Sequence, residues 1–116
     1  MIAQPERGHL YWVKIPGEPQ SKRRPALVVS IDARNRNAND VMVIPASTRL
    51  RPSVTHVRLR EGQGGVPRDS MLKCEQLTTL PKDALVDGPL GGPLSLFVMN
   101  AVEKGVLRAI GVPIDC

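Results

Sequence analysis

A short apolar run that begins directly behind three cations constrains the fold of this chain more than any other feature. Lys22, Arg23 and Arg24 run into Pro25, and the apolar residues 26–29 follow at once. Aliphatic and β-branched residues bounded by turn-forming residues are typical of a strand that is buried on both faces. Proline has no backbone N–H and is tolerated at the first residue of a strand. The junction therefore predicts that Arg24 is held at the rigid start of a buried strand, where its planar guanidinium is suited to bind a phosphate.

The length and composition favour one small domain that needs no metal or cofactor. The 116 residues predict a single domain over residues 1–116, and a chain of this size buries somewhat more than ~60% of its unfolded surface. No apolar run approaches the ~20 residues of a membrane-spanning helix, and residues 5–7 interrupt any export signal at the N-terminus. Cys74 and Cys116 lie far apart without a C-x-x-C spacing, which fits a reducing compartment. We therefore expect a cytoplasmic protein.

The positive charge is concentrated in the first half of the chain. The formal net charge is +5. Residues 1–60 hold eleven lysines and arginines against four acidic residues, a net charge of +7, whereas residues 61–116 hold five against seven, a net charge of −2. This asymmetry favours a polyanionic partner, although a solvated basic face without a site would give the same charge.

The pattern along the chain predicts short strands followed by one helix. We expect polar or turn-rich connections over residues 32–40, 80–82 and 88–93. Ser95 is suited to cap a helix from about Leu96 to Ile110, and Gly111 is suited to end it. The expected strands are residues 8–15, 26–31, 41–45 and 55–59, with one or two more within 69–79. These elements predict a mainly β fold, a small twisted sheet or partly open barrel packed by a C-terminal helix.

Two hydroxyl side chains follow the third expected strand. If strands 26–31 and 41–45 are antiparallel neighbours, the end of one lies beside the start of the other, which brings Ser47 and Thr48 near Arg24. A guanidinium beside a hydroxyl can bind two oxygens of one phosphate. The residues leave open the alternative that these hydroxyls only satisfy a turn and that Arg24 is a surface cation.

Four segments occur in an order that resembles a known family. They are Arg7-Gly8 before a Leu-Tyr-Trp-Val strand, residues 24–30, residues 43–48, and Asp69-Ser70 followed by Glu75-Gln76-Leu77. Over residues 7–111 this ordered set resembles the MazF/PemK (Kid) toxins of bacterial toxin–antitoxin pairs. The resemblance implies an SH3-like, partly open barrel of the CcdB/PemK type with a C-terminal helix, and a homodimer. It also implies metal-independent, sequence-specific cleavage of single-stranded RNA, and a MazE-like antitoxin whose C-terminal segment occupies the RNA groove.

By the same resemblance, the catalytic arginine is Arg24 and the catalytic hydroxyl is Ser47 or, alternatively, Thr48. The family carries a threonine at the end of the third strand, so the serine is a departure. A shift of one residue along a strand turns a side chain to the other face, so only one of the two can be the equivalent; we favour Ser47. His9 and Lys14 are further departures, because the family commonly carries acidic residues there.

The residue types suit cleavage by the RNA's own 2′-hydroxyl, which leaves a 2′,3′-cyclic phosphate and a 5′-hydroxyl. Arg24 is suited to stabilise charge on the phosphoryl oxygens, and Ser47 is suited to position them. The proton-transfer role stays unassigned. His56 or His9 is a candidate, although a lone histidine on a strand is more often a packing or surface residue, and in the family the arginine itself is often credited.

Other polar residues are expected to hold the RNA. Cations near Arg24 can track the RNA backbone. Aromatic residues for base stacking are scarce and Trp12 is expected in the core, so the loops 17–23 and 35–39 are the candidates for reading bases, unless they are ordinary hairpin tips. The expected substrate-binding residues are Gln20, Ser21, Lys22, Arg23, Arg49, Glu75 and Gln76.

Two alternative functions remain at this point. One is a poison of DNA gyrase with the same fold, as in the CcdB relatives, which needs no arginine–hydroxyl pair. The other is a nucleic-acid-binding module without catalytic activity.

Overall fold

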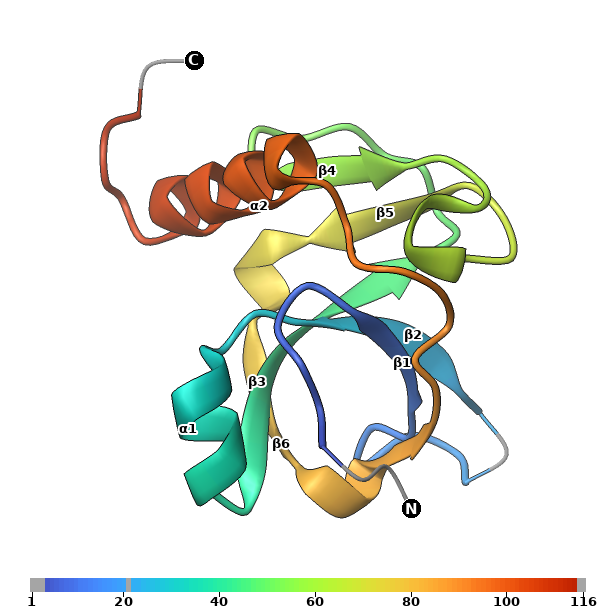
Figure 1. Ribbon diagram of the computed structural model, residues 1–116. Helices are drawn as coiled ribbons and strands as arrows, with labels where there is room; N and C mark the ends of the chain where they lie inside the picture. Colours follow the sequence, from blue (N-terminus) through green and yellow to red (C-terminus); the bar gives the residue numbers. More distant parts are fainter. Residues whose placement is uncertain (1–3, 21, 115–116) are drawn as a thin grey trace.

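The computed structural model describes residues 4–20 and 22–114, and an antiparallel sheet of seven strands forms the framework of this part of the chain (Figure 1). Six strands follow the order β4-β5-β3-β2-β1-β7, and β6 pairs with β3 outside this path. The strands are β1 Leu10–Val13, β2 Arg24–Val28, β3 Asp40–Ser47, β4 His56–Leu59, β5 Ser70–Lys73, β6 Thr78–Pro81 and β7 Leu85–Asp87. The sheet curls without closing, which confirms the expected mainly β, partly open barrel.

The strand β2 is buried on both faces, as its composition predicts. Ala26, Leu27 and Val28 are fully buried. Leu27 packs into the core beneath the C-terminal helix, whereas Ala26 and Val28 point into a second core inside the barrel. Because side chains alternate along a strand, one short apolar run thus supplies both cores.

The strand β3 joins the two halves of the sheet. Its first part pairs with β2 and β6, and its last residues pair with β5. In Figure 1 it crosses from the lower barrel toward the upper strands β4 and β5. The end of β3 therefore lies where the two halves of the sheet separate.

The C-terminal helix α2 spans Leu96–Ala109 and packs on β4 and on the turn at residues 74–76 (Figure 1). Its first turn is capped as predicted, because the Ser95 hydroxyl accepts a hydrogen bond from the Val98 backbone N–H at 3.2 Å. Gly111, with φ of 90°, follows the helix end. Among the described residues, no helix has the length and apolar character needed to cross a membrane.

The segment expected as a loop over residues 32–40 instead contains the helix α1, Asp32–Asn37. Asn35 explains the difference, since its side chain is fully buried and its amide donates to the Ser30 carbonyl at 2.9 Å. A tertiary contact thus overrides the turn preference of a polar, asparagine-rich segment.

Further differences lie at strand ends and in short turns. The strand β2 ends at Val28, short of the expected Ile31, which is 63% exposed. Residues expected as a loop extend β6 to Pro81, and β7 was not anticipated. The described part of the chain also contains three 3₁₀ turns: η1 Gln63–Gly65, η2 Cys74–Gln76 and η3 Lys82–Ala84.

Candidate active site

A polar cavity of about 570 Å³ lies where β2 begins and β3 ends. Its walls come from the β1–β2 connection, the start of the β3–β4 loop and the segment 73–76. Its lining residues are Ile15, Glu18, Lys22, Arg24, Pro45, Ala46, Ser47, Thr48, Arg49, Lys73 and Gln76. The sequence-predicted pair of Arg24 with a hydroxyl is therefore brought into one cavity.

The strand register places Arg24 and Ser47 on the same side of the sheet. The β2–β3 ladder pairs Ala26 with Pro45, and the same register continued two residues further puts Arg24 opposite Ser47. Residues directly opposite in an antiparallel pair share a face, and so do residues two apart on one strand. The side chains of Arg24 and Ser47 thus face the cavity together, whereas Thr48 follows in the bend after β3.

A carboxylate, Glu18, holds the Arg24 guanidinium in place. Arg24 donates from Nε to Glu18 Oε1 at 3.0 Å and from Nη2 to Glu18 Oε2 at 2.9 Å. This two-point pair fixes the plane of the guanidinium. It lowers the pKa of Glu18, chiefly through the hydrogen bond from Arg24, and raises the pKa of Arg24 through the same contact. Both groups are therefore charged at neutral pH.

The Ser47 hydroxyl takes part in the turn that follows β3. Its Oγ accepts a hydrogen bond from the Arg49 backbone N–H at 3.1 Å. This contact is the turn role that the sequence left as an alternative. It uses an acceptor position of the hydroxyl, so the O–H can still donate to a ligand in the cavity.

The cavity is strongly cationic. Lys22, Arg24, Arg49 and Lys73 line it against the single carboxylate of Glu18. Sequence reasoning missed Glu18 and Lys73. The position of Glu18 in the loop just before the cationic triplet is a signal that could have identified it, whereas Lys73 enters the cavity only through the pairing of β5 with β3.

The other predicted substrate-binding residues divide between the cavity and its surroundings. Lys22, Arg49 and Gln76 line the cavity, but Gln20 is exposed and does not. Arg23 lies over the Trp12 ring, 5.2 Å from its centroid, and pairs with Asp87 at 3.4 Å. Ser21 lies outside the described residues.

One sequence expectation about the surroundings of the site is wrong. Trp12 is only half-buried beneath Arg23 and belongs to neither core cluster. In the segment 35–39, Asn35 is buried against Ser30, and none of its residues lines the Arg24 cavity. The sequence of this asparagine-rich segment does not indicate that part of it forms the helix α1.

Neither histidine lines the Arg24 cavity. His9 lies near the Gly91 carbonyl, 3.4 Å from its Nδ1. His56 Nε2 lies 3.0 Å from Glu75 Oε2. Glu75 is the last of the predicted substrate-binding residues, and it does not line the cavity. The cavity therefore offers Glu18, not a histidine, as its candidate proton acceptor.

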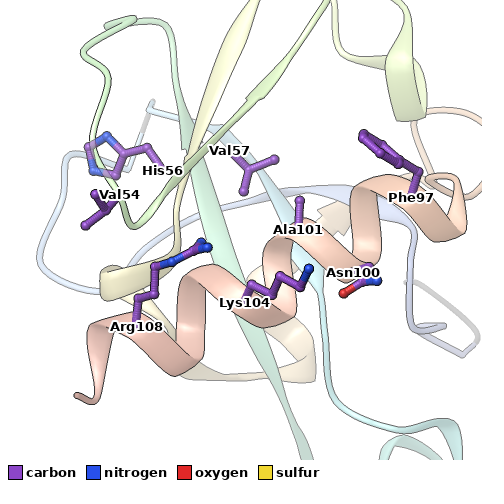
Figure 2. A pocket seen from close by; sticks show the side chains of 8 residues that line it. All are labelled: Val54, His56, Val57, Phe97, Asn100, Ala101, Lys104 and Arg108. Carbon is purple, nitrogen blue, oxygen red and sulfur yellow. The ribbon is translucent and has the colours of Figure 1, made fainter. Parts of the chain in front are cut away.

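A second, shallower cavity of about 340 Å³ lies between α2 and β4 (Figure 2). Figure 2 shows Val57 and Ala101 at its centre, His56 and Val54 at one end and Phe97 at the other. It is more apolar than the Arg24 cavity and holds no acidic residue. Among the described residues, no group of three or more histidine, cysteine or acidic side chains could hold a metal ion.

Comparison with known proteins gives a consistent set of relatives. Residues 6–110 match the family described as the PemK-like, MazF-like toxin of type II toxin–antitoxin systems. The chain is 31% identical over 110 residues to endoribonuclease MazF2 of Mycobacterium bovis, covering 90% of this chain and 95% of that protein. It is 30% identical over 87 residues to endoribonuclease EndoA of Bacillus subtilis, covering 71% and 75%.

The solved structures agree with these sequence relatives. A structure of an endoribonuclease in complex with its cognate antitoxin, from a mycobacterial species, superposes with a TM-score of 0.79 at 28% identity. The superposition covers 96% of this chain and 99% of the other. These relatives support the expectation of an endoribonuclease and not the alternative of a gyrase poison.

Proposed function

The chain belongs to the PemK-like, MazF-like toxins of type II toxin–antitoxin systems, and from this premise we propose that it is an endoribonuclease whose active site is the Arg24 cavity. The observation that carries the proposal is the placement of Arg24, which is fixed by Glu18 and faces Ser47 across the end of the β2–β3 ladder. This arrangement offers a phosphate both a planar cation and a hydroxyl. The substrate is single-stranded RNA, and the product is a cut strand that no longer supports translation.

Arg24 binds the scissile phosphate without giving up Glu18. The carboxylate occupies two of the five guanidinium N–H donors, and no other described residue accepts a hydrogen bond from this group. The remaining donors on Nη1 and Nη2 can therefore reach the phosphoryl oxygens. As the 2′-oxygen attacks, negative charge grows on these oxygens, and donors already fixed in place stabilise it most effectively.

Ser47 supplies the second contact to the phosphate. Its Oγ already accepts from the Arg49 N–H, and this leaves the O–H able to donate to a phosphoryl oxygen. The strand register supports Ser47 over Thr48 as the residue opposite Arg24. Ser47 thus positions the phosphorus in line with the attacking oxygen.

Glu18 takes the proton of the 2′-hydroxyl. It is the one carboxylate in the cavity and its pKa is held low by Arg24, so it is ionised at neutral pH. The 2′-oxygen forms a bond to phosphorus, the bond from phosphorus to the 5′-oxygen breaks, and the leaving oxygen takes a proton from water. The products are a 2′,3′-cyclic phosphate and a 5′-hydroxyl, and the reaction as written does not require a metal ion.

The other lining residues hold the strand. Lys22, Arg49 and Lys73 surround Arg24 and can contact neighbouring phosphates. Gln76 presents an amide to the same cavity, which suits hydrogen bonding to a base edge. The bases next to the cut are therefore read by the walls 18–24 and 73–76.

We also propose that the toxin is a homodimer that a MazE-like antitoxin neutralises in the cytoplasm. Leu96 and Phe97 at the start of α2 are 88% and 85% exposed, and Ile110 at its end is 71% exposed. Such apolar residues on one helix favour burial against a second copy. The cationic cavity in turn suits an acidic antitoxin segment that competes with RNA. A sedimentation experiment should show a dimer that Phe97→Glu converts to a monomer.

The test of the endoribonuclease uses two matched oligonucleotides. One is all RNA, and the other carries a 2′-deoxynucleotide at the cleavage site. We expect the protein to cut only the first, in the presence of EDTA, with a 2′,3′-cyclic phosphate detected by mass spectrometry. Cleavage of both strands would rule out attack by the 2′-hydroxyl. Cleavage of neither, with inhibition of DNA supercoiling, would instead favour the gyrase poison.

A second comparison tests the choice of hydroxyl. Ser47→Ala should lower kcat strongly, whereas Thr48→Ala should have a small effect, because only Ser47 lies opposite Arg24 in the register. Equal effects of the two substitutions would mean that neither hydroxyl has the proposed position.

A further inference from the structure

The β3–β4 loop, residues 48–55, forms one wall of the Arg24 cavity, and at its far end the His56 imidazole contacts it alongside bonds from Thr55 to Glu75 and to the Cys74 backbone. Thr48 and Arg49 at the start of the loop line the cavity. His56, the first residue of β4, lies directly behind the loop, and its side chain is only 9% exposed. Figure 2 shows the ring beside Val54, at the edge of the second cavity.

Both nitrogens of the His56 ring face hydrogen-bond acceptors. Nδ1 lies 2.7 Å from the Arg51 carbonyl oxygen, and Nε2 lies 3.0 Å from Glu75 Oε2. Neither a carbonyl nor a carboxylate can donate a hydrogen bond. A neutral imidazole has one N–H and can satisfy only one of these acceptors, whereas the imidazolium has two and satisfies both. The site is therefore built for the protonated ring.

The two contacts join two walls of the cavity. Arg51 belongs to the loop that carries Arg49, while Glu75 belongs to the turn η2, next to Gln76 of the opposite wall. Glu75 Oε1 also accepts from the Thr55 hydroxyl at 2.9 Å, so this carboxylate contacts the end of the loop through both Thr55 and His56. A loss of the imidazolium would release the Arg51 carbonyl or Glu75.

We propose that protonated His56 is a positioning residue that fastens the β3–β4 loop to the turn η2 and thereby holds Thr48 and Arg49 at the RNA site. It touches neither RNA nor the reacting atoms. Its effect is on RNA binding, because the loop carries a phosphate-binding cation, while Arg24, Glu18 and Ser47 are fixed by their own contacts. We call the contacts of His56 with the Arg51 carbonyl and with Glu75 the clamp. Its effect on RNA binding rests on the proposed function, whereas the existence of the clamp does not.

The charges around His56 have opposing effects. The hydrogen bond to the Arg51 carbonyl raises the pKa of His56, burial opposes it, and Glu75 raises it further. Lys73, which pairs with His56 across β4 and β5, lowers it. On α2, Lys104 and Arg108 line the same cavity as His56 and bring further positive charge. The net pKa is raised, so the clamp is complete at low pH and is lost as the pH rises through that value.

A chain with two histidines allows the clamp to be observed directly. The imidazole signals in an NMR pH titration are assigned with His9→Gln, which removes the one other histidine signal. We expect the His56 midpoint to lie above ~6.5, the value for a histidine in an unfolded peptide, and to fall in Glu75→Gln. A midpoint that Glu75→Gln leaves unchanged would overturn the pairing.

Two functional measurements then separate positioning from general stability. Relative to its cleavage of an unstructured arginine peptide at the same pH, trypsin should cut after Arg49 faster as the pH rises in the wild type, whereas this relative rate should stay constant in His56→Gln. The KM for RNA should rise by roughly fivefold between pH 6 and 8.5, the effect of losing a partly screened charge-assisted hydrogen bond, while kcat follows the same profile in both proteins. His56→Gln should show the high KM throughout, and His9→Gln should behave as the wild type.

The possible failures are distinguishable. A KM with the same pH profile in the wild type and His56→Gln, or protection of Arg49 that does not depend on pH, would overturn the clamp. If the wild type cuts no RNA at any pH, the proposed function fails, and the NMR and trypsin measurements still decide the clamp. If His56→Gln does not fold, Glu75→Gln carries the same comparisons.

Discussion

The Arg24 guanidinium can bind a phosphate while it stays paired with Glu18, because its five donors point in different directions. Glu18 binds along one edge, through Nε and Nη2, and the remaining donors have no hydrogen-bond partner among the described residues, although Arg24 lines the cavity with Ser47. A lysine ammonium is a point charge and cannot be fixed along one edge while binding along another. The geometry of the site therefore depends on the shape of this cation as much as on its charge.

Substitution of Arg24 separates these two properties. Arg24→Ala should abolish cleavage, and Arg24→Lys should lower kcat by about 10²-fold or more, because the charge stays but the fixed donors to the phosphoryl oxygens are lost. Single-turnover cleavage measures the effect, and circular dichroism checks the fold. Arg68→Lys, an exposed arginine that does not line the cavity, is the matched control. Full activity in Arg24→Lys would contradict the proposed role.

Glu18 gives the site its expected dependence on pH. Its pKa lies below the usual value because Arg24 donates to it, so protonation removes the base only as the pH falls through that lowered pKa. Glu18→Gln should lower kcat by roughly 10²- to 10⁴-fold, as expected for loss of a general base. KM should fall or stay constant, since the substitution removes a negative charge from beside the phosphate. A pH–rate profile of the wild type and Glu18→Gln measures both; an acid limb that survives in Glu18→Gln would assign the base elsewhere.

At the scale of elements, the predictable parts are those with a strong local pattern. The apolar run behind Pro25 predicts β2, and Ser95 with the 3.6-residue periodicity predicts α2 to within one residue of its end. The helix α1 was missed because a buried amide, Asn35, stabilises it through Ser30 and not through local propensity. The strand β7 was missed because three residues carry too little periodicity, and its pairing with β1 decides its conformation.

The candidate site shows the same division. Arg24 and Ser47 were predictable, since each lies at the end of a strand with a clear pattern and the register brings them together. The contribution of Lys73 depends on a pairing between β3 and β5 that no local signal encodes. His56 was considered for proton transfer because of its residue type, but its position behind the loop follows from contacts with Arg51 and Glu75.

Where α2 packs on the turn η2, we expect a glycine-to-alanine substitution to destabilise the protein, although helix propensity alone favours alanine. Gly105 is buried, and a Cβ at this position would lie 2.8 Å from Cys74 Sγ and 3.2 Å from Cys74 Cβ. Alanine favours a helix over glycine by ~1 kcal/mol, but overpacking costs about 1–3 kcal/mol. Gly105→Ala should therefore lower the free energy of unfolding by about 1 kcal/mol.

The control for this prediction removes the sulfur. In a Cys74→Ala background, Gly105→Ala should cost less or stabilise, because the nearest atom is gone. Urea unfolding of the four proteins in this double-mutant cycle measures the coupling. Equal effects of Gly105→Ala in both backgrounds would show that the close approach to Cys74 is not the cause. Burial raises the pKa of the Cys74 thiol to about 11, so the thiol stays protonated throughout these measurements.

At the scale of the whole molecule, the fold gathers charge that the sequence distributes. The excess of cations lies in residues 1–60, but the cavity draws Lys22, Arg24 and Arg49 from that half and Lys73 from the other. Several other arginines of the first half are occupied elsewhere, for example Arg34 with Asp40 at 2.6 Å and Arg58 with Asp69 at 2.7 Å. The net charge of the first half therefore overstates the number of cations that can bind RNA. We take the four cations that line the cavity as the number that contacts phosphates.

This count predicts how RNA binding responds to salt. Four cations at phosphates should give a plot of log affinity against log salt concentration with a slope near −3, since single strands contribute about −0.7 per neutralised phosphate. Lys22→Gln and Arg49→Gln should each reduce the slope by roughly 0.7. Binding is measured by fluorescence anisotropy with a strand that carries a 2′-deoxynucleotide at the cleavage site, so that no cleavage intervenes. Arg58→Gln is the control, because Arg58 pairs with Asp69 outside the cavity, and its slope should match the wild type. A slope that falls equally in Arg58→Gln would mean that RNA responds to the overall charge and not to the cations around Arg24.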